Sequence, residues 1–113
     1  MYNIESFDDL DNFIIENNDK IILLYFGATW CGPCKLLKQK LSEEESQCEM
    51  PLLKVCYIDV DNNEDISSTY KITTLPTQIF IELSNNRVKI VSKIEGYDYT
   101  KLLLEYQSCV GSK

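Results

Sequence analysis

Residues 21–26, Ile-Ile-Leu-Leu-Tyr-Phe, form an apolar run in which polar and apolar side chains do not alternate. A run of this kind is typical of a strand that helices cover on both faces. Such strands belong to α/β domains, in which helical crossovers join parallel strands. We therefore expect residues 21–26 to form the central strand. Functional residues are expected just beyond it, because open α/β sheets usually carry their sites at the carboxyl ends of strands.

The rest of the chain predicts four helices and four further strands. Apolar residues recur at helical spacing after Ser6, from 35 to 46, after Asn63 and after Gly96. Extended patterns cover 2–4, 52–59, 77–83 and 87–94, with a turn at 84–86 that suits a hairpin. The order β-α-β-α-β-α-β-β-α predicts one α/β domain over residues 1–113, with a mixed sheet of about five strands flanked by four helices.

A pair of cysteines follows the central strand, in the sequence Trp30-Cys31-Gly32-Pro33-Cys34. Two residues three apart at the start of a helix share one face, so these cysteines can form a disulfide with little backbone movement. Unpaired N–H groups and the positive end of the helix dipole favour the thiolate form of Cys31. We predict that Cys31 is the attacking sulfur. Cys34, one turn deeper, would then resolve the mixed disulfide with a substrate.

The other three cysteines bear on whether the pair is a metal site. A structural zinc site needs a second pair of ligands, but the chain has no histidine, and Cys48, Cys56 and Cys109 lack suitable spacing. We therefore expect no metal site. Each of the three falls on an apolar stripe of its predicted element, so we interpret them as small core residues. The acidic run 43–45 is interpreted as a solvated helix face.

Charge and cysteine number limit the partners and the compartment. Eleven basic and eighteen acidic residues give a net charge of -7, which should repel nucleic acid and anionic membranes. The first residues do not have the pattern of a secretory leader, and no apolar run is long enough to span a bilayer. An odd number of cysteines suits a reducing compartment. We expect a soluble, cytoplasmic monomer.

The residues around the cysteine pair read Ala28-Thr29-Trp30-Cys31-Gly32-Pro33-Cys34-Lys35. This sequence resembles the active site of the thioredoxin family. Further resemblances are Val60-Asp61 at a strand-to-helix junction, Leu75-Pro76-Thr77 in a loop whose proline bond is cis, and Gly96 beside the approaching substrate. Together with the length and element order, they cover nearly the whole chain. The resemblance implies the thioredoxin fold.

The resemblance also implies a protein-disulfide reductase that acts by dithiol–disulfide exchange through Cys31 and Cys34. By analogy, a Gly-Pro dipeptide between the cysteines accompanies reductants. The implied substrate-binding residues form a mostly apolar rim: Trp30, Gly32, Pro33, Leu75, Pro76 and Gly96. The protein would bind no cofactor and would receive electrons from an NADPH-linked thioredoxin reductase. Its clients would be disulfide-containing proteins such as peroxiredoxins or ribonucleotide reductase.

Three positions depart from the family pattern. Tyr25 occupies the position of a buried aspartate, and Tyr57 that of its accompanying lysine; Gln39 occupies the position of a helix-bending proline. A phenol, with a reference pKa near ~10, is a poor base at neutral pH. We therefore hypothesise that Cys34 loses its proton to water or to the developing thiolate. The tyrosines would replace a buried charge pair with apolar area and hydroxyls.

Two other functions remain open at this point. The chain could be a non-catalytic binding subunit on the same scaffold, or a specialised redox donor dedicated to one partner. Retention of both cysteines, Trp30 and Pro76 disfavours the first, whereas the tyrosine substitutions are compatible with the second. Nothing in the sequence identifies a glutathione site, as a glutaredoxin-like role would require.

Overall fold

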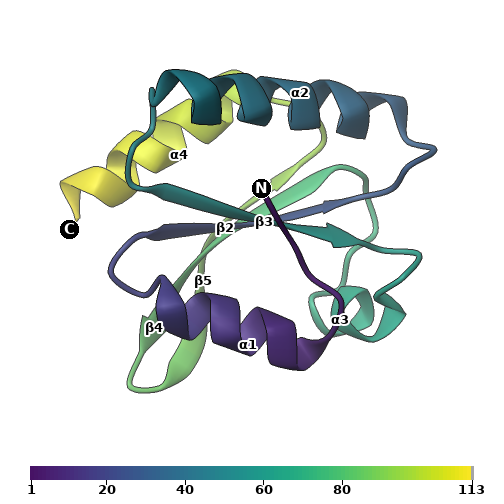
Figure 1. Ribbon diagram of the computed structural model, residues 1–113, viewed down its shortest axis with the longest axis horizontal. Helices are drawn as coiled ribbons and strands as arrows, with labels where there is room; N and C mark the ends of the chain where they lie inside the picture. The colour runs from purple at the N-terminus through teal and green to yellow at the C-terminus, as the bar shows by residue number, and fades with distance from the viewer. Residues whose placement is uncertain (113) are drawn as a thin grey trace.

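A computed structural model describes residues 1–112 (Figure 1). The elements are β1 (Tyr2–Asn3), α1 (Phe7–Glu16), β2 (Ile21–Gly27), α2 (Gly32–Gln47), β3 (Leu53–Asp59), α3 (Glu64–Thr69), β4 (Thr77–Ser84), β5 (Arg87–Glu95) and α4 (Tyr99–Gly111). This order confirms the predicted one. No helix within the described range is long and apolar enough to cross a membrane.

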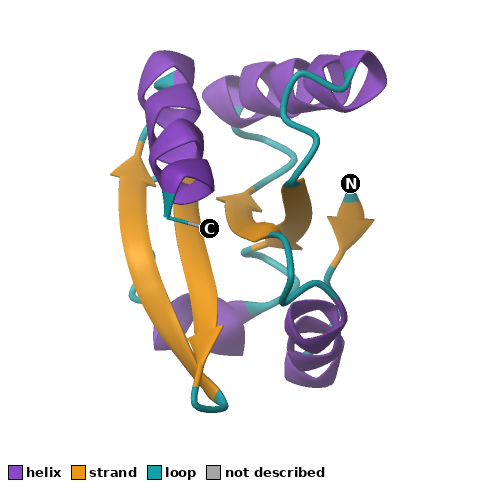
Figure 2. Cartoon of the chain, turned by 90° about the vertical axis from the view of Figure 1, so that its left-hand side faces the viewer, coloured by secondary structure: helices purple, strands orange, loops and turns teal. Residues whose placement is uncertain are grey.

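The five strands form one mixed sheet in the order β1-β3-β2-β4-β5. Strand β3 pairs in parallel with β1 and β2, whereas β4 pairs antiparallel with β2 and β5. Helices α2 and α4 cover one face of the sheet, and α1 and α3 cover the other (Figures 1 and 2). All seven residues of β2 are buried. The absence of polar alternation in its sequence thus reflects a strand that is covered on both sides.

Alternating side chains of β2 divide the core into two layers. Ile22, Leu24 and Phe26 pack in the layer under α1 and α3. Leu23 and Tyr25 pack in the layer under α2 and α4. Because successive side chains of a strand point to opposite faces, Tyr25 lies on the same side of the sheet as the helix that follows the cysteine pair.

The start of α1 forms as its sequence predicts. The Asp9 N–H donates to Ser6 Oγ at 3.1 Å, and the Glu5 N–H donates to Asp9 Oδ2 at 3.0 Å. The bond to Ser6 satisfies a backbone donor that the first turn of a helix leaves without a partner, and the bond from Glu5 fixes the residue that precedes the cap. Leu10 and Ile14 belong to the apolar residues that recur at helical spacing after Ser6, and both are buried on the inner face of α1.

The three additional cysteines differ in burial. Cys56 is buried, as predicted, and Cys109 is half-buried against the layer under α2 and α4. The prediction that Cys48 is a core residue is wrong, because this residue is exposed. Helix α2 ends at Gln47, and Cys48 turns the chain with a φ of 55°. The apolar stripe of α2 therefore ends before it reaches Cys48.

The predicted solvated face at 43–45 is also wrong at one position. Glu44 is buried, and its carboxylate accepts a hydrogen bond from the Met50 N–H, which closes the loop after α2. Burial raises the pKa of Glu44, while the bond from Met50 opposes that shift and the charges of Glu45 and Glu49 add to it. The Glu44 carboxylate can be buried here because the Met50 N–H of the loop donates a hydrogen bond to it.

Candidate active site

The cysteine pair lies where the loop after β2 meets α2. Cys31 is the N-cap of the helix and Cys34 is in its first turn. The two form a disulfide, with a Cα–Cα distance of 5.2 Å. The Cys34 N–H also donates to Cys31 Sγ at 3.2 Å. The sulfur of Cys31 thus occupies the capping position, where backbone donors and the helix dipole stabilise negative charge.

Both cysteines are largely covered in this oxidised form. Cys31 is 6% exposed and Cys34 is 2% exposed, so Cys34 is the deeper residue, as predicted. Cys31, the predicted attacking sulfur, is thus itself buried in the oxidised form. Ala28 packs with the pair, and Val60 and Leu75 close over it from other segments.

One wall of the site is formed by the residues that flank Cys31. Trp30 is 68% exposed, and its Nε1–H donates to Asp61 Oδ2 at 2.8 Å. This bond ties the indole to the loop between β3 and α3. Gly32 and Pro33 are exposed at the start of α2. An apolar surface thus adjoins the disulfide.

The opposite wall is formed by Leu75, Pro76 and Gly96. The Leu75-Pro76 peptide bond is cis, as the resemblance implies. Leu75 packs against the cysteine pair, and the Gly96 N–H donates to the Pro76 carbonyl oxygen at 2.7 Å. Gly96 has a φ of 89°, which favours glycine. The fold thus connects all six predicted docking residues, which come from three separate segments, around the disulfide. Their contact with a substrate stays a prediction.

Two tyrosines lie directly beneath the cysteines. The rings of Tyr25 and Tyr57 meet edge to face, with centroids 5.2 Å apart. The Tyr25 hydroxyl donates to the carbonyl oxygen of Cys34. A methyl group on Gly27 would lie 3.1 Å from each ring and 3.4 Å from Cys34 Cβ. Because Gly27 has no side chain, both rings can pack under the disulfide.

A family model described as Thioredoxin matches residues 4–105, which is most of the chain. The chain belongs to the thioredoxin family. Thioredoxin of Chlamydia pneumoniae is 32% identical over 103 residues, covering 91% of this chain and 96% of that protein. Thioredoxin-T of Drosophila melanogaster is 40% identical over 87 residues, and the match spans 75% of this chain but only 54% of that longer relative.

Solved structures agree with this assignment. The crystal structure of Fasciola hepatica thioredoxin superposes with a TM-score of 0.84 at 31% identity, covering 96% of this chain and 98% of that one. The predicted thioredoxin fold is therefore confirmed. Family membership together with the cysteine pair makes this thioredoxin a thiol–disulfide oxidoreductase that acts by dithiol–disulfide exchange.

The floor of this thioredoxin site is uncharged at neutral pH. Burial, followed by the neighbouring Tyr57, raises the pKa of Tyr25, with a smaller opposing effect from the backbone of Lys38. Burial also raises the pKa of Tyr57, and the charges of Asp59 and Asp61 add to that shift. The Lys38 ammonium lies 4.6 Å from the centre of the Tyr57 ring. Because the pKa values of Tyr25 and Tyr57 are both raised above the ordinary 10.0, both phenols keep their protons at neutral pH.

Gln78 is a polar residue of the site that sequence reasoning missed. It is 0% exposed on β4, directly opposite Tyr25 of β2. Its Nε2 donates to the Gly96 carbonyl oxygen at 3.3 Å. The available signal was a long amide side chain inside a strand whose next three residues, 79–81, are apolar and buried.

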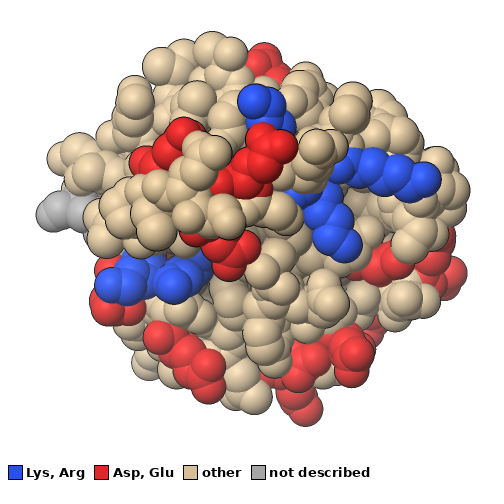
Figure 3. Space-filling view, turned by 45° about the horizontal axis from the view of Figure 1, so that its top comes forward, with Lys and Arg blue, Asp and Glu red and all other residues tan. Residues whose placement is uncertain are grey.

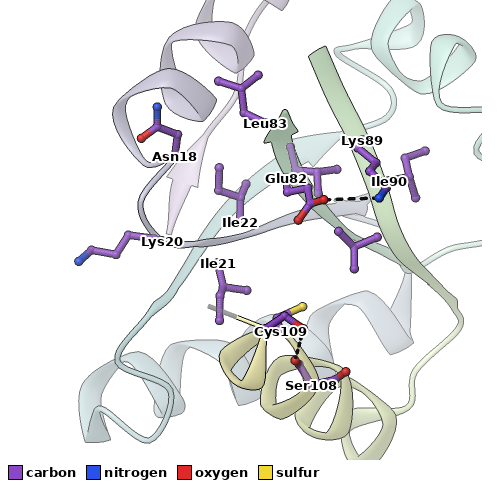
Figure 4. Close-up of a pocket in the computed structure, with 13 residues that line it drawn as sticks. Asn18, Lys20, Ile21, Ile22, Glu82, Leu83, Lys89, Ile90, Ser108 and Cys109 are labelled. Carbon is purple, nitrogen blue, oxygen red and sulfur yellow. Dashed lines mark hydrogen bonds and ion pairs between the residues drawn. The ribbon is translucent and has the colours of Figure 1, made fainter. Parts of the chain in front are cut away.

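A cavity of about 540 Å³ lies away from the disulfide, between the start of β2, the β4–β5 hairpin and α4 (Figure 4). Glu82 and Lys89 form an ion pair beside it, at 3.7 Å. None of its lining residues belongs to the predicted site. Within residues 1–112, no group of three or more His, Cys, Asp or Glu side chains is placed to hold a metal ion.

Proposed function

We propose that this thioredoxin reduces disulfides in client proteins, with Cys31 as the attacking and Cys34 as the resolving sulfur. The Cys31 thiolate attacks one sulfur of the client disulfide, forms a mixed disulfide and displaces the second client sulfur as a thiolate. The Cys34 thiolate then attacks Cys31 Sγ, closes the internal disulfide and displaces the first client sulfur. Two electrons pass to the client, whose thiolates take protons from water.

One observation carries this proposal: the disulfide closes at the N-terminus of α2, with Cys31 Sγ accepting the Cys34 N–H at 3.2 Å. The same donor and the helix dipole would stabilise the Cys31 thiolate in the reduced form. The greater burial of Cys34 supports its assignment as the second nucleophile.

A client segment would lie across the rim formed by Trp30, Gly32, Pro33, Leu75, Pro76 and Gly96. Exposed Trp30 offers apolar area, and Gly96 has no side chain to obstruct an extended backbone. Acidic and basic side chains are interspersed over the face formed by α2 and α4 (Figure 3). On this side, clients would therefore be selected by apolar contact and backbone pairing more than by electrostatic attraction to a surface of one charge.

An NADPH-linked thioredoxin reductase would restore the dithiol, and the clients would include peroxiredoxins or ribonucleotide reductase. This part rests on family membership. A cytoplasmic location and a monomeric state fit the odd number of cysteines and the net charge of -7. Dedication to a single partner is the second candidate, because Tyr25 and Tyr57 give the site an unusual floor.

Reduction of insulin by dithiothreitol tests the activity. The wild-type protein should accelerate precipitation of the insulin B chain, whereas Cys31→Ser should leave the uncatalysed rate. A wild-type rate equal to that of Cys31→Ser would refute a general reductase function. Activity towards a single cellular disulfide protein, with none towards insulin, would instead support the dedicated donor.

A further inference from the structure

Two buried polar side chains lie side by side beneath the site. Tyr25 on β2 and Gln78 on β4 are directly opposite each other in the antiparallel pair. Residues paired in this way have their side chains on the same face of the sheet. Both are 0% exposed. They therefore form one polar unit in a core layer that is otherwise mainly apolar.

The two side chains bond to opposite walls of the site. The Tyr25 hydroxyl donates to the Cys34 carbonyl oxygen, in the first turn of α2. The Gln78 amide donates to the Gly96 carbonyl oxygen at 3.3 Å. Because the Gly96 N–H already donates to Pro76 at 2.7 Å, both backbone polar groups of Gly96 are held. Each wall is thus attached to the same region of the sheet.

Stability alone is a poor reason for Gln78 at this position. Its Oε1 is buried and has no hydrogen-bond partner among the described residues. A buried acceptor without a partner destabilises the folded state, and an apolar side chain of the same size would avoid that cost in this layer. What the amide provides here is its bond to Gly96.

We propose that Tyr25 and Gln78 are positioning residues of the exchange reaction. Tyr25 holds the turn that carries Cys34, and Gln78 holds the wall formed by Pro76 and Gly96. This inference rests on the proposed function, and it assigns the two residues to different steps. Tyr25 acts on the resolution of the mixed disulfide, and Gln78 acts on the docking of a protein client.

The first experiment separates attack from resolution. Reduced protein is mixed with excess insulin, quenched with acid after set times and analysed by mass spectrometry. Tyr25→Phe keeps the ring and removes only the hydroxyl, so resolution should be about tenfold slower, as the loss of one buried hydrogen bond can produce. The mixed disulfide on Cys31 should then accumulate, while the rate of attack stays within about twofold of wild type.

Tyr106→Phe is the matched control, because it removes a phenol hydroxyl in the same core layer that accepts the Leu52 N–H at 3.1 Å, just before β3 and away from the disulfide. It should resolve the mixed disulfide at the wild-type rate. The role of Tyr25 is overturned if both variants slow resolution equally, or if Tyr25→Phe resolves as fast as wild type. Thermal unfolding verifies that each variant is folded.

The second experiment separates docking from chemistry. Gln78→Met keeps the length of the side chain and removes its amide. KM for insulin should rise about fivefold with kcat nearly unchanged, because a hydrogen bond of ~1 kcal/mol that positions the wall is lost. The rate with the small disulfide 5,5′-dithiobis(2-nitrobenzoic acid), which needs no extended docking, should stay the same. If Gln78→Met does not fold, Gln78→Leu serves the same purpose.

Gln39→Met removes an amide from the exposed face of α2 and should leave both assays unchanged. Equal loss with insulin and with the small disulfide, or no loss with either, would overturn the role of Gln78. These results are distinguishable from failure of the proposed function, in which the wild-type protein itself would not reduce insulin.

Discussion

Replacing Gly27 with alanine tests the packing on which the floor of the site depends. The added methyl group would lie 3.1 Å from a ring carbon of Tyr25 and of Tyr57, and 3.4 Å from Cys34 Cβ. Both rings are buried and belong to one core cluster, so neither can move without disturbing its neighbours. The substitution therefore overpacks the core directly below the disulfide.

Overpacking of this kind typically costs about 1–3 kcal/mol. Alanine also restricts the unfolded chain more than glycine does, which stabilises the folded protein by about 0.4–1 kcal/mol. This gain applies here because Gly27 does not need a positive φ. The free energy of unfolding should therefore fall by about 1–2 kcal/mol, as measured by urea denaturation followed by circular dichroism.

Gly111→Ala is the control, because a methyl group at that position meets no heavy atom within 4 Å. It should leave stability unchanged or raise it slightly. The Gly27 substitution should cost less in a Tyr57→Val background, in which one of the two crowded rings is gone. Wild-type stability of Gly27→Ala, or an equal cost in both backgrounds, would refute the packing argument.

Three further predictions concern other sites. Ser6→Ala removes the cap of α1 and should lower the free energy of unfolding by about 1 kcal/mol, as measured by urea denaturation; no loss would contradict the capping role. Glu44→Gln should remove a pH dependence of stability. Because burial raises the pKa of Glu44 above its ordinary 4.5, the wild type should lose stability relative to the variant as pH rises from below 4.5 through the raised value, and parallel urea-midpoint curves would contradict this. Tyr25→Asp places an ionisable carboxyl beneath Cys34, so the pH profile of insulin reduction should gain an ionisation that the wild type lacks; an unchanged profile would remove any role for the substitution in proton transfer.

The sequence was most informative where a local pattern decides the structure. The unbroken apolar run identified β2 because burial on both faces requires it, and the spacing of the cysteines predicted their disulfide. The prediction failed at Cys48 because the end of α2 is set by a left-handed residue that is not glycine. Residue type gave no signal for that turn.

The polar contacts beneath the site could not be predicted in the same way. Gln78 bonds to Gly96, eighteen residues away, and Tyr25 bonds to a backbone oxygen rather than to a side chain. Such partners depend on strand register and on the height of α2 above the sheet. The resemblance put Tyr25 and Tyr57 at the positions of a buried charge pair, but only the fold shows that both rings pack against Gly27.

Trapping of the mixed disulfide tests the division of labour between the cysteines most directly. Reduced Cys34→Ser protein is incubated with insulin, and covalent adducts are analysed by nonreducing mass spectrometry, with Cys31→Ser in parallel. Cys34→Ser should retain insulin in a disulfide to Cys31, and Cys31→Ser should retain little. Equal trapping by both variants, or adducts that form mainly through Cys34, would contradict the assignment of Cys31 as the attacking sulfur.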